Sequence, residues 1–119
     1  MKVAAAAADE KKAEDVVALY VREAFGITDY FIIASGQNDR QVRTIIGYIE
    51  ERLREVGRRP LRREGVTEAE WALLDYGDFV VHVFLDEVRK FYDLERLWSD
   101  APRVEWEEEA GRAGVENRV

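Results

Sequence analysis

The sequence predicts a single α/β domain with a mixed β-sheet and flanking helices. Two short apolar runs on either side of Tyr76-Gly77, within residues 70–85, are typical of an antiparallel β-hairpin. Earlier in the chain, an apolar run at residues 30–35 leads into an amphipathic helix, as in a crossover to a neighbouring strand. The chain has 119 residues, which suits one domain with its own core.

The first segment, residues 3–14, is expected to form a short helix with a frayed start. It contains five consecutive alanines, and alanine has the highest helix propensity. A strand follows at residues 16–22, where β-branched and aromatic side chains favour extended backbone, although the spacing of Val17 and Val21 also fits a helix. Residues 30–35 predict a second, buried strand.

The longest predicted helix begins at Asn38, which can act as its N-cap. Gln41 lies three residues later and completes a capping box. The helix ends at Gly57, and Pro60 precedes a short strand at residues 61–64 that we expect at a sheet edge, because proline lacks a backbone donor. The apolar residues at helical spacing are Val42, Ile45, Ile46, Ile49, Leu53 and Val56.

The hairpin has one apolar face and one mixed face. A two-residue turn at Tyr76-Gly77 would pair Trp71 with His82 across the strands. The apolar face, which we expect in the core, holds Ala72, Leu74, Phe79, Val81 and Val83. The mixed face, which we expect to meet a partner, holds Trp71, Leu73, Asp75, Val80 and His82.

A last helix is expected from residue 87 to about residue 98, with Asp86 as its cap. Its apolar arc is too wide for one core contact, so part of it should touch a partner or the C-terminal segment. Pro102 ends any helix there. The domain is therefore predicted to occupy residues 1–104, followed by an acidic, disordered tail at residues 105–119.

Composition excludes several classes of function. The chain has no cysteine and one histidine, so neither thiolate nor multi-histidine metal sites are available. A formal net charge of -7 disfavours nucleic acid as the main ligand and suits a basic protein partner, although it also serves solubility alone. No apolar run approaches the roughly 20 residues of a membrane span, and the start does not resemble a signal peptide. We expect a cytoplasmic protein without a membrane contact.

The sequence evidence for catalytic residues is weak. Ser35-Gly36 before a helix could present backbone donors to a phosphate, but the lysine and further glycines of a phosphate-binding loop are missing. Asp39, Asp75 and Asp78 could gather a metal for nucleotidyl transfer, but the last two flank a turn, where aspartate is common. We expect no catalytic residue, metal or cofactor.

His82 and the arginines suggest no chemistry either. His82 has no nearby serine or cysteine nucleophile, and it is more plausibly a cross-strand neighbour of Trp71. Arg62 and Arg63, with Arg58 and Arg59 upstream, form a basic patch that is usually a solvated edge, with an auxiliary phosphate contact as the alternative.

Three segments, residues 28–45, 71–85 and 87–104, resemble the ribosomal silencing factor family, also called Iojap-like. The resemblance implies a nucleotidyltransferase-like fold without demonstrated transferase chemistry. It further implies binding to the fourteenth protein of the large ribosomal subunit, which blocks joining of the small subunit and lowers translation when nutrients are scarce. Homodimers occur in the family.

The resemblance is carried by particular residues. The matching turn motif includes Ser35, Gly36, Asp39, Arg40 and Gln41. The hairpin motif matches at Trp71, Asp75, Gly77, Asp78, His82 and Val83, and the last motif at Tyr92, Leu94, Glu95, Leu97 and Trp98. Where the family usually has a glycine after the first helix, this chain has Ala13-Glu14. The partner-binding residues we predict are Trp71, Leu73, Asp75, Tyr76, His82, Tyr92, Leu94, Trp98 and Asp100.

Two other functions remain as alternatives. A nucleotidyltransferase-type enzyme would use the aspartate set and should bind nucleotide and magnesium. A generic dimeric scaffold would use the broad apolar arc of the last helix and should self-associate without a ribosomal partner.

Overall fold

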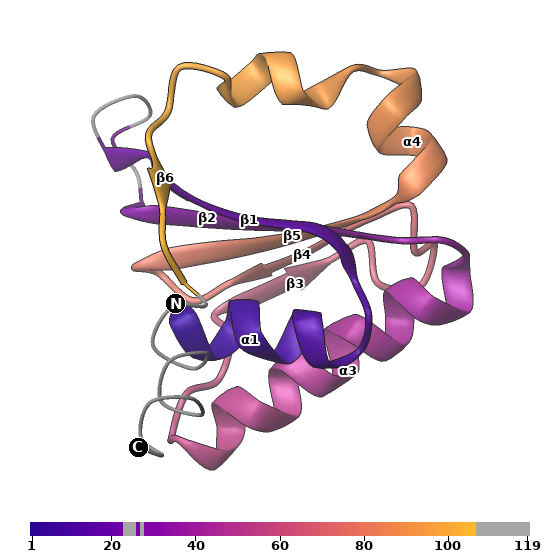
Figure 1. Cartoon of the computed structure of the whole chain (residues 1–119). Helices are drawn as coiled ribbons and strands as arrows, with labels where there is room; N and C mark the ends of the chain where they lie inside the picture. Colours follow the sequence, from indigo (N-terminus) through magenta and orange to yellow (C-terminus); the bar gives the residue numbers. More distant parts are fainter. Residues whose placement is uncertain (23–25, 27, 107–119) are drawn as a thin grey trace, which may run out of the picture.

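The computed structural model describes residues 1–22, 26 and 28–106. One sheet separates two layers of helix: α1 and α3 cover one face, and α4 with the following segment lies over the other (Figure 1). The described elements are α1 (Lys2–Glu10), β1 (Glu14–Tyr20), β2 (Tyr30–Gly36), α3 (Asp39–Glu55), β3 (Arg62–Glu64), β4 (Trp71–Asp75), β5 (Phe79–Leu85), α4 (Asp86–Phe91), the 3-10 helix η1 (Leu94–Trp98) and β6 (Arg103–Val104).

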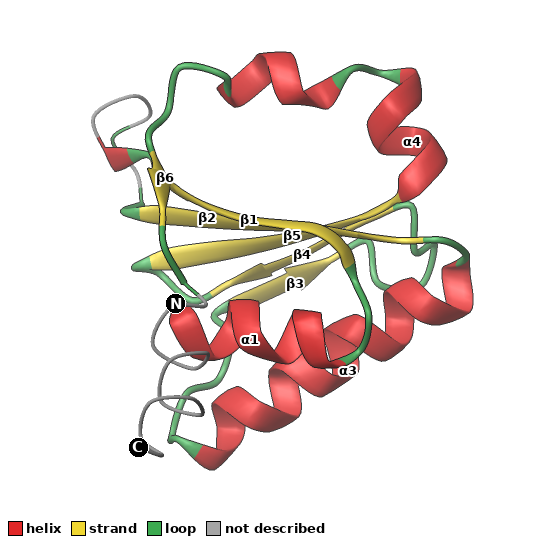
Figure 2. Ribbon diagram, viewed as in Figure 1, coloured by secondary structure: helices red, strands yellow, loops and turns green. Residues whose placement is uncertain are grey.

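The sheet is mixed, as predicted. Its strand order is β3-β4-β5-β2-β1-β6, and β2 with β5 is the parallel pair among otherwise antiparallel neighbours. α3, β3 and β4 lie between β2 and β5 in the chain, so the helix makes the crossover that a parallel pair requires (Figure 2). β3 lies at a sheet edge, as the proline before it indicated.

The helices α1 and α3 pack on one face of the sheet, which we name the α3 face. Four of the five consecutive alanines of α1, Ala4, Ala5, Ala7 and Ala8, are buried, so this helix packs against the domain along its length. The strand predicted at residues 16–22 is present, but it begins and ends two residues earlier, at Glu14 and Tyr20. Arg22 already has helical backbone and lies outside the strand. The buried residues of α3 are Val42, Ile45, Ile46, Ile49 and Leu53, while Val56 follows the helix and is exposed.

The N-terminus of α3 has the predicted cap and a variant of the predicted capping box. Asn38 Oδ1 accepts a hydrogen bond from the backbone N–H of Gln41 at 2.8 Å. The side chain of Gln41 bonds the N–H of Gln37 at 2.7 Å, where a capping box would use the N–H of Asn38. The two hydrogen bonds therefore hold the backbone at Gln37, just before the cap, and at Gln41, in the first turn of the helix.

The hairpin is present, but its predicted pairing is wrong. Trp71 pairs with Phe84, and His82 pairs with Leu73. The turn is centred one residue later than predicted, because the N–H of Tyr76 bonds the carbonyl of Phe79 at 2.9 Å and Gly77 adopts a φ of +92°. Each pair shifts by two residues, so every side chain keeps its predicted face.

The continuous helix predicted for residues 87–98 is wrong. α4 has six residues, Asp93 adopts a left-handed φ of 52°, and η1 follows. Asp86 is not the cap but lies in the first turn, where its carboxylate pairs with Lys90. A straight helix could not bury so wide an apolar arc. The break lets Leu94 and Trp98 pack on the sheet.

The chain beyond η1 adds a strand that we did not predict. β6 pairs with β1, and the indole N–H of Trp106 bonds the carbonyl of Val16 at 3.3 Å. These contacts lie at the border that we predicted between domain and tail, and most of the predicted tail, residues 107–119, lies outside the described residues.

Candidate binding surface on the α4 face

The face of the sheet beneath α4 and η1, here the α4 face, is only partly covered. Its buried cluster is small and consists of Leu19, Val21, Ile33, Phe84, Leu94, Trp98 and Ala101. Large apolar side chains remain exposed around it: Trp71 by 44%, Phe91 by 78%, Tyr92 by 64% and Leu97 by 60%. Several large apolar side chains exposed on one face of a small domain are a feature of contact sites. We name the α4 surface as Trp71, Leu73, Asp75, Phe91, Tyr92, Leu97 and Asp100.

Five of the predicted binding residues belong to the α4 surface: Trp71, Leu73, Asp75, Tyr92 and Asp100. Phe91 and Leu97 join them; neither was predicted to bind a partner, although Leu97 belongs to the last motif of the resemblance. A shallow hollow of about 340 Å³ lies beside Trp71 and is lined by Glu64, Gly65 and Leu73. The α4 surface thus combines protruding rings with a small depression.

The indole of Trp71 is held from beneath. Its Nε1–H donates to Nδ1 of His82 at 3.0 Å, and its ring centroid lies 4.9 Å from that of Phe84. Trp71 lies directly opposite Phe84, and His82 lies directly opposite Leu73. Trp71 and His82 are therefore diagonal neighbours across the hairpin instead of the direct pair that we predicted. One side of the indole is therefore packed while the other is open.

His82 is a buried, neutral imidazole. Only 6% of it is exposed, and burial lowers its pKa to about 4. Since Nδ1 accepts from Trp71, the ring proton sits on Nε2, and no described group lies within hydrogen-bonding distance of that nitrogen. The rings of Phe31, Phe84 and Trp98 surround the imidazole. His82 thus contributes one acceptor, aimed at Trp71.

Four residues that we predicted to bind a partner are buried: Tyr76, His82, Leu94 and Trp98. Leu94 and Trp98 attach η1 to the sheet. Tyr76 lies on the α3 face, where it stacks on Phe79 with ring centroids 4.9 Å apart, and burial raises its pKa to about 12. Direct partner contact by these four stays a prediction. In the structure His82, Leu94 and Trp98 pack beneath the α4 surface, whereas Tyr76 lies in the core on the other face of the sheet.

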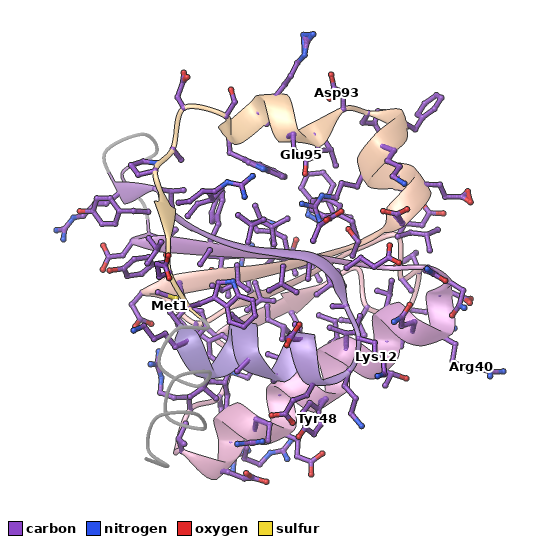
Figure 3. All side chains as sticks on the ribbon, viewed as in Figure 1. Met1, Lys12, Arg40, Tyr48, Asp93 and Glu95 are labelled. Carbon is purple, nitrogen blue, oxygen red and sulfur yellow. The ribbon has the colours of Figure 1, made fainter. Side chains whose placement is uncertain are left out.

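The turn motif of the resemblance has a structural role at two of its positions. The hydroxyl of Ser35 is buried and accepts a hydrogen bond from Arg89, so it is not open to a phosphate. Gly36 lies where a Cβ would approach Val42 to 3.0 Å. Asp39 pairs with Arg43 at 3.1 Å, whereas Arg40 extends away from the body of the protein (Figure 3).

Arg89 is a central residue that sequence reasoning missed. It is 3% exposed, and its guanidinium also bonds the carboxylate of Glu95 at 2.7 Å and the carbonyl of Asp15 at 3.2 Å. Glu95 lies on the side of η1 that faces the sheet (Figure 3). The network joins α4, η1, β1 and the end of β2. Nothing in the local sequence marks this arginine, because its partners are distant along the chain.

The three aspartates considered for nucleotidyl transfer do not converge. Asp75 pairs with Arg62 at 3.3 Å, and Asp78 pairs with Arg58 at 2.6 Å, which holds the pKa of the Asp78 carboxyl below its ordinary value. Within the described ranges, no group of three or more histidine, aspartate or glutamate side chains is placed to hold a metal ion. These two ion pairs neutralise Arg58 and Arg62 of the basic patch. Arg63 of the same patch is bound to Glu50 at 2.8 Å.

No helix in the described part of the chain is long and apolar enough to cross a membrane.

Comparison with known proteins identifies relatives along nearly the whole chain. The model of the family described as "Ribosomal silencing factor during starvation" matches residues 1–118. "Ribosomal silencing factor RsfS" of Bacillus subtilis is 46% identical over 102 residues, which cover 86% of each chain. A crystal structure of a Bacillus halodurans protein matches with a TM-score of 0.76 and 42% identity, covering 87% of this chain and 93% of that one.

A more distant relative is mouse "Mitochondrial assembly of ribosomal large subunit protein 1". It is 30% identical over 93 residues, covering 76% of this chain and 41% of the mouse protein. The bacterial relatives are similar to this chain over most of its length, in sequence and, for the Bacillus halodurans protein, also in fold. The chain therefore belongs to the ribosomal silencing factor family.

Proposed function

We propose that this protein binds the large ribosomal subunit through the fourteenth protein of that subunit and sterically blocks joining of the small subunit. Translation is thereby repressed under nutrient limitation, and the protein acts in the cytoplasm. The observation that carries the proposal is the α4 surface, whose large side chains are exposed on β4 (Trp71) and along the α4–η1 segment (Phe91, Tyr92 and Leu97). The family membership and the name of the mouse relative support a ribosomal partner.

The α4 surface has the chemistry of a docking site for a basic protein. Aromatic side chains buried at the centre of an interface can each contribute about 2 kcal/mol or more. Asp75 follows Trp71 and Leu73 on the same face of β4, Asp100 is exposed just after η1, and the whole chain carries a net charge of -7. Complementary charge would speed association with a positively charged ribosomal protein.

Steric blocking needs no catalytic residue. The aspartates that a nucleotidyltransferase would need are separately paired with arginines, and the Ser35 hydroxyl is occupied by Arg89. These contacts favour a binding protein over an enzyme. Direct tests are nucleotide and magnesium titrations, which should show no saturable binding.

A subunit-joining experiment tests the proposed function. Purified large subunits are incubated with a saturating amount of the protein, small subunits are added, and joined ribosomes are separated by sedimentation. We expect the protein to travel with the large subunit and the joined fraction to fall. Equal joining with and without the protein would overturn the proposal.

Two further measurements resolve its finer parts. Titration calorimetry with the isolated fourteenth protein of the large subunit should show direct binding if that protein is the partner. Sedimentation equilibrium of the protein alone decides whether it forms a homodimer. Self-association without any binding to large subunits would favour the scaffold alternative.

A further inference from the structure

We propose that His82 is a positioning residue, which holds the indole of Trp71 in the orientation that docks on the partner. This inference deepens the proposed function and rests on it. The role is separate from direct contact, because the imidazole is buried beneath the α4 surface and Trp71 is exposed above it.

The first argument is the geometry of the pair. Trp71 lies on β4, and nearly half of its surface is open to solvent, so the sheet alone leaves the indole free to turn. The hydrogen bond from Nε1–H to Nδ1 of His82, at 3.0 Å, and the ring contact with Phe84 fix it. A side chain held in its bound orientation loses less entropy on association.

The second argument is that the histidine costs stability where it lies. Its Nε2–H has no partner among the described groups, and aromatic rings surround it. A buried donor without a partner destabilises the folded state, whereas an apolar side chain of similar size would not. The hydrogen bond to Trp71 is the contact that the imidazole makes and that an apolar side chain could not make.

The third argument is the rigidity of the acceptor. The imidazole lies against Phe31 with ring centroids 4.6 Å apart, and it stacks nearly parallel to Phe84. Trp98, which attaches η1 to the sheet, contacts it from above. His82 therefore cannot easily swing away, and the position of its Nδ1 defines the position of the indole.

The test uses His82→Leu and Trp71→Phe in the full chain, singly and together. His82→Leu removes the acceptor and keeps an apolar side chain of similar size. Trp71→Phe removes the donor, keeps an aromatic ring and assigns the Trp71 indole signal in the NMR spectrum. Affinity for purified large ribosomal subunits is measured for all four proteins.

We expect His82→Leu to leave thermal stability unchanged or raised, since it removes the unpartnered nitrogen. The Trp71 indole proton should shift upfield and exchange faster with solvent. Affinity for large subunits should fall about fivefold, as expected for loss of one orienting hydrogen bond. In the Trp71→Phe background the same change should have no further effect on affinity.

Wild-type affinity in His82→Leu, or equal losses in both backgrounds, would overturn the positioning role while leaving the proposed function intact. An unchanged indole signal in His82→Leu would also overturn it. Failure of the wild-type protein to bind large subunits would instead refute the proposed function, and this inference with it.

Discussion

Nη1 of Arg89 lies 2.7 Å from the hydroxyl oxygen of Ser35, although 54 positions separate the two residues in the chain. Both side chains are buried. The same nitrogen bonds the carbonyl of Asp15, which has a left-handed φ of 49° at a bulge in β1. One arginine of α4 therefore fixes the end of β2, the bulge of β1 and, through Glu95, the segment that carries part of the α4 surface.

Arg89→Met should lower the free energy of unfolding by about 1–3 kcal/mol, because the change leaves the buried Ser35 hydroxyl, and the part-buried Asp15 carbonyl, without this donor. The partner Glu95 is half-exposed, so its loss adds little. Urea unfolding followed by circular dichroism measures the change. Lys90→Met, which breaks the pair of an exposed lysine with Asp86, is the matched control and should cost much less than Arg89→Met. Equal losses in the two variants would contradict the role of the network.

Trp71→Ala should weaken binding to large ribosomal subunits about tenfold or more, because it removes the largest exposed ring of the hairpin. Thermal stability should fall only modestly, since the side chain is 44% exposed. Sedimentation of labelled protein with large subunits gives the affinity. Val56→Ala is the control: it removes an exposed apolar side chain after α3, in the layer on the other face of the sheet. A large stability loss with unchanged affinity would place Trp71 in the core instead.

Gly65→Ala should destabilise the protein by about 1–3 kcal/mol and disturb the Trp71 indole signal. Gly65 has a φ of +72°, and an added Cβ would lie 2.2 Å from the carbonyl oxygen of Trp71. Gly47→Ala is the matched control, because Gly47 is in the middle of α3 with open space around it. That change should stabilise the helix by roughly 0.5–1 kcal/mol. Thermal melts of the two variants should move in opposite directions.

Acid should destabilise the protein through His82 as the pH falls from 7 to 5. The unfolded imidazole takes up a proton near pH 6.5, whereas in the folded protein burial lowers the pKa of His82 to about 4. Between these values the unfolded state binds more protons, so the free energy of unfolding should fall by about 2 kcal/mol from about pH 7 to pH 5. The ion pair of Asp78 with Arg58 lowers the pKa of that carboxyl, so its contribution is lost only at still lower pH.

Urea unfolding at a series of pH values measures this dependence. His82→Leu should show a smaller fall across the same window, because the chain has no other histidine and only the N-terminal amine, whose pKa burial also lowers, keeps the same sign of pH dependence. A wild-type stability that is flat down to pH 5 would mean that the imidazole is already protonated, or is solvated, in the folded state.

Much of the fold could be predicted because its signals are local. The cap at Asn38 depends on neighbours three residues away, and the faces of the hairpin follow from strict alternation along each strand. The predicted pairs were wrong because the position of the turn depends on one glycine, yet the faces survived since a shift of two residues preserves them. Membership in the family also came from local motifs, which the comparisons confirm.

The candidate site was harder to predict from local sequence signals than the fold was. Leu94 and Trp98 were expected on one long helix with Tyr92, and only packing against the sheet separates the buried pair from the exposed ring. The left-handed backbone of Asp93 makes that separation. Aspartate adopts this conformation only occasionally, so an aspartate in the sequence does not predict it.

By itself, the sequence determined the order and type of most elements, the two faces of the hairpin and the family, because these depend on residues close together in the chain. Only the tertiary structure decided which aromatic side chains are exposed, that His82 is a buried acceptor for Trp71, and that Arg89 reaches Ser35. Burial and hydrogen bonding between distant residues depend on how layers pack, and no local pattern records that packing.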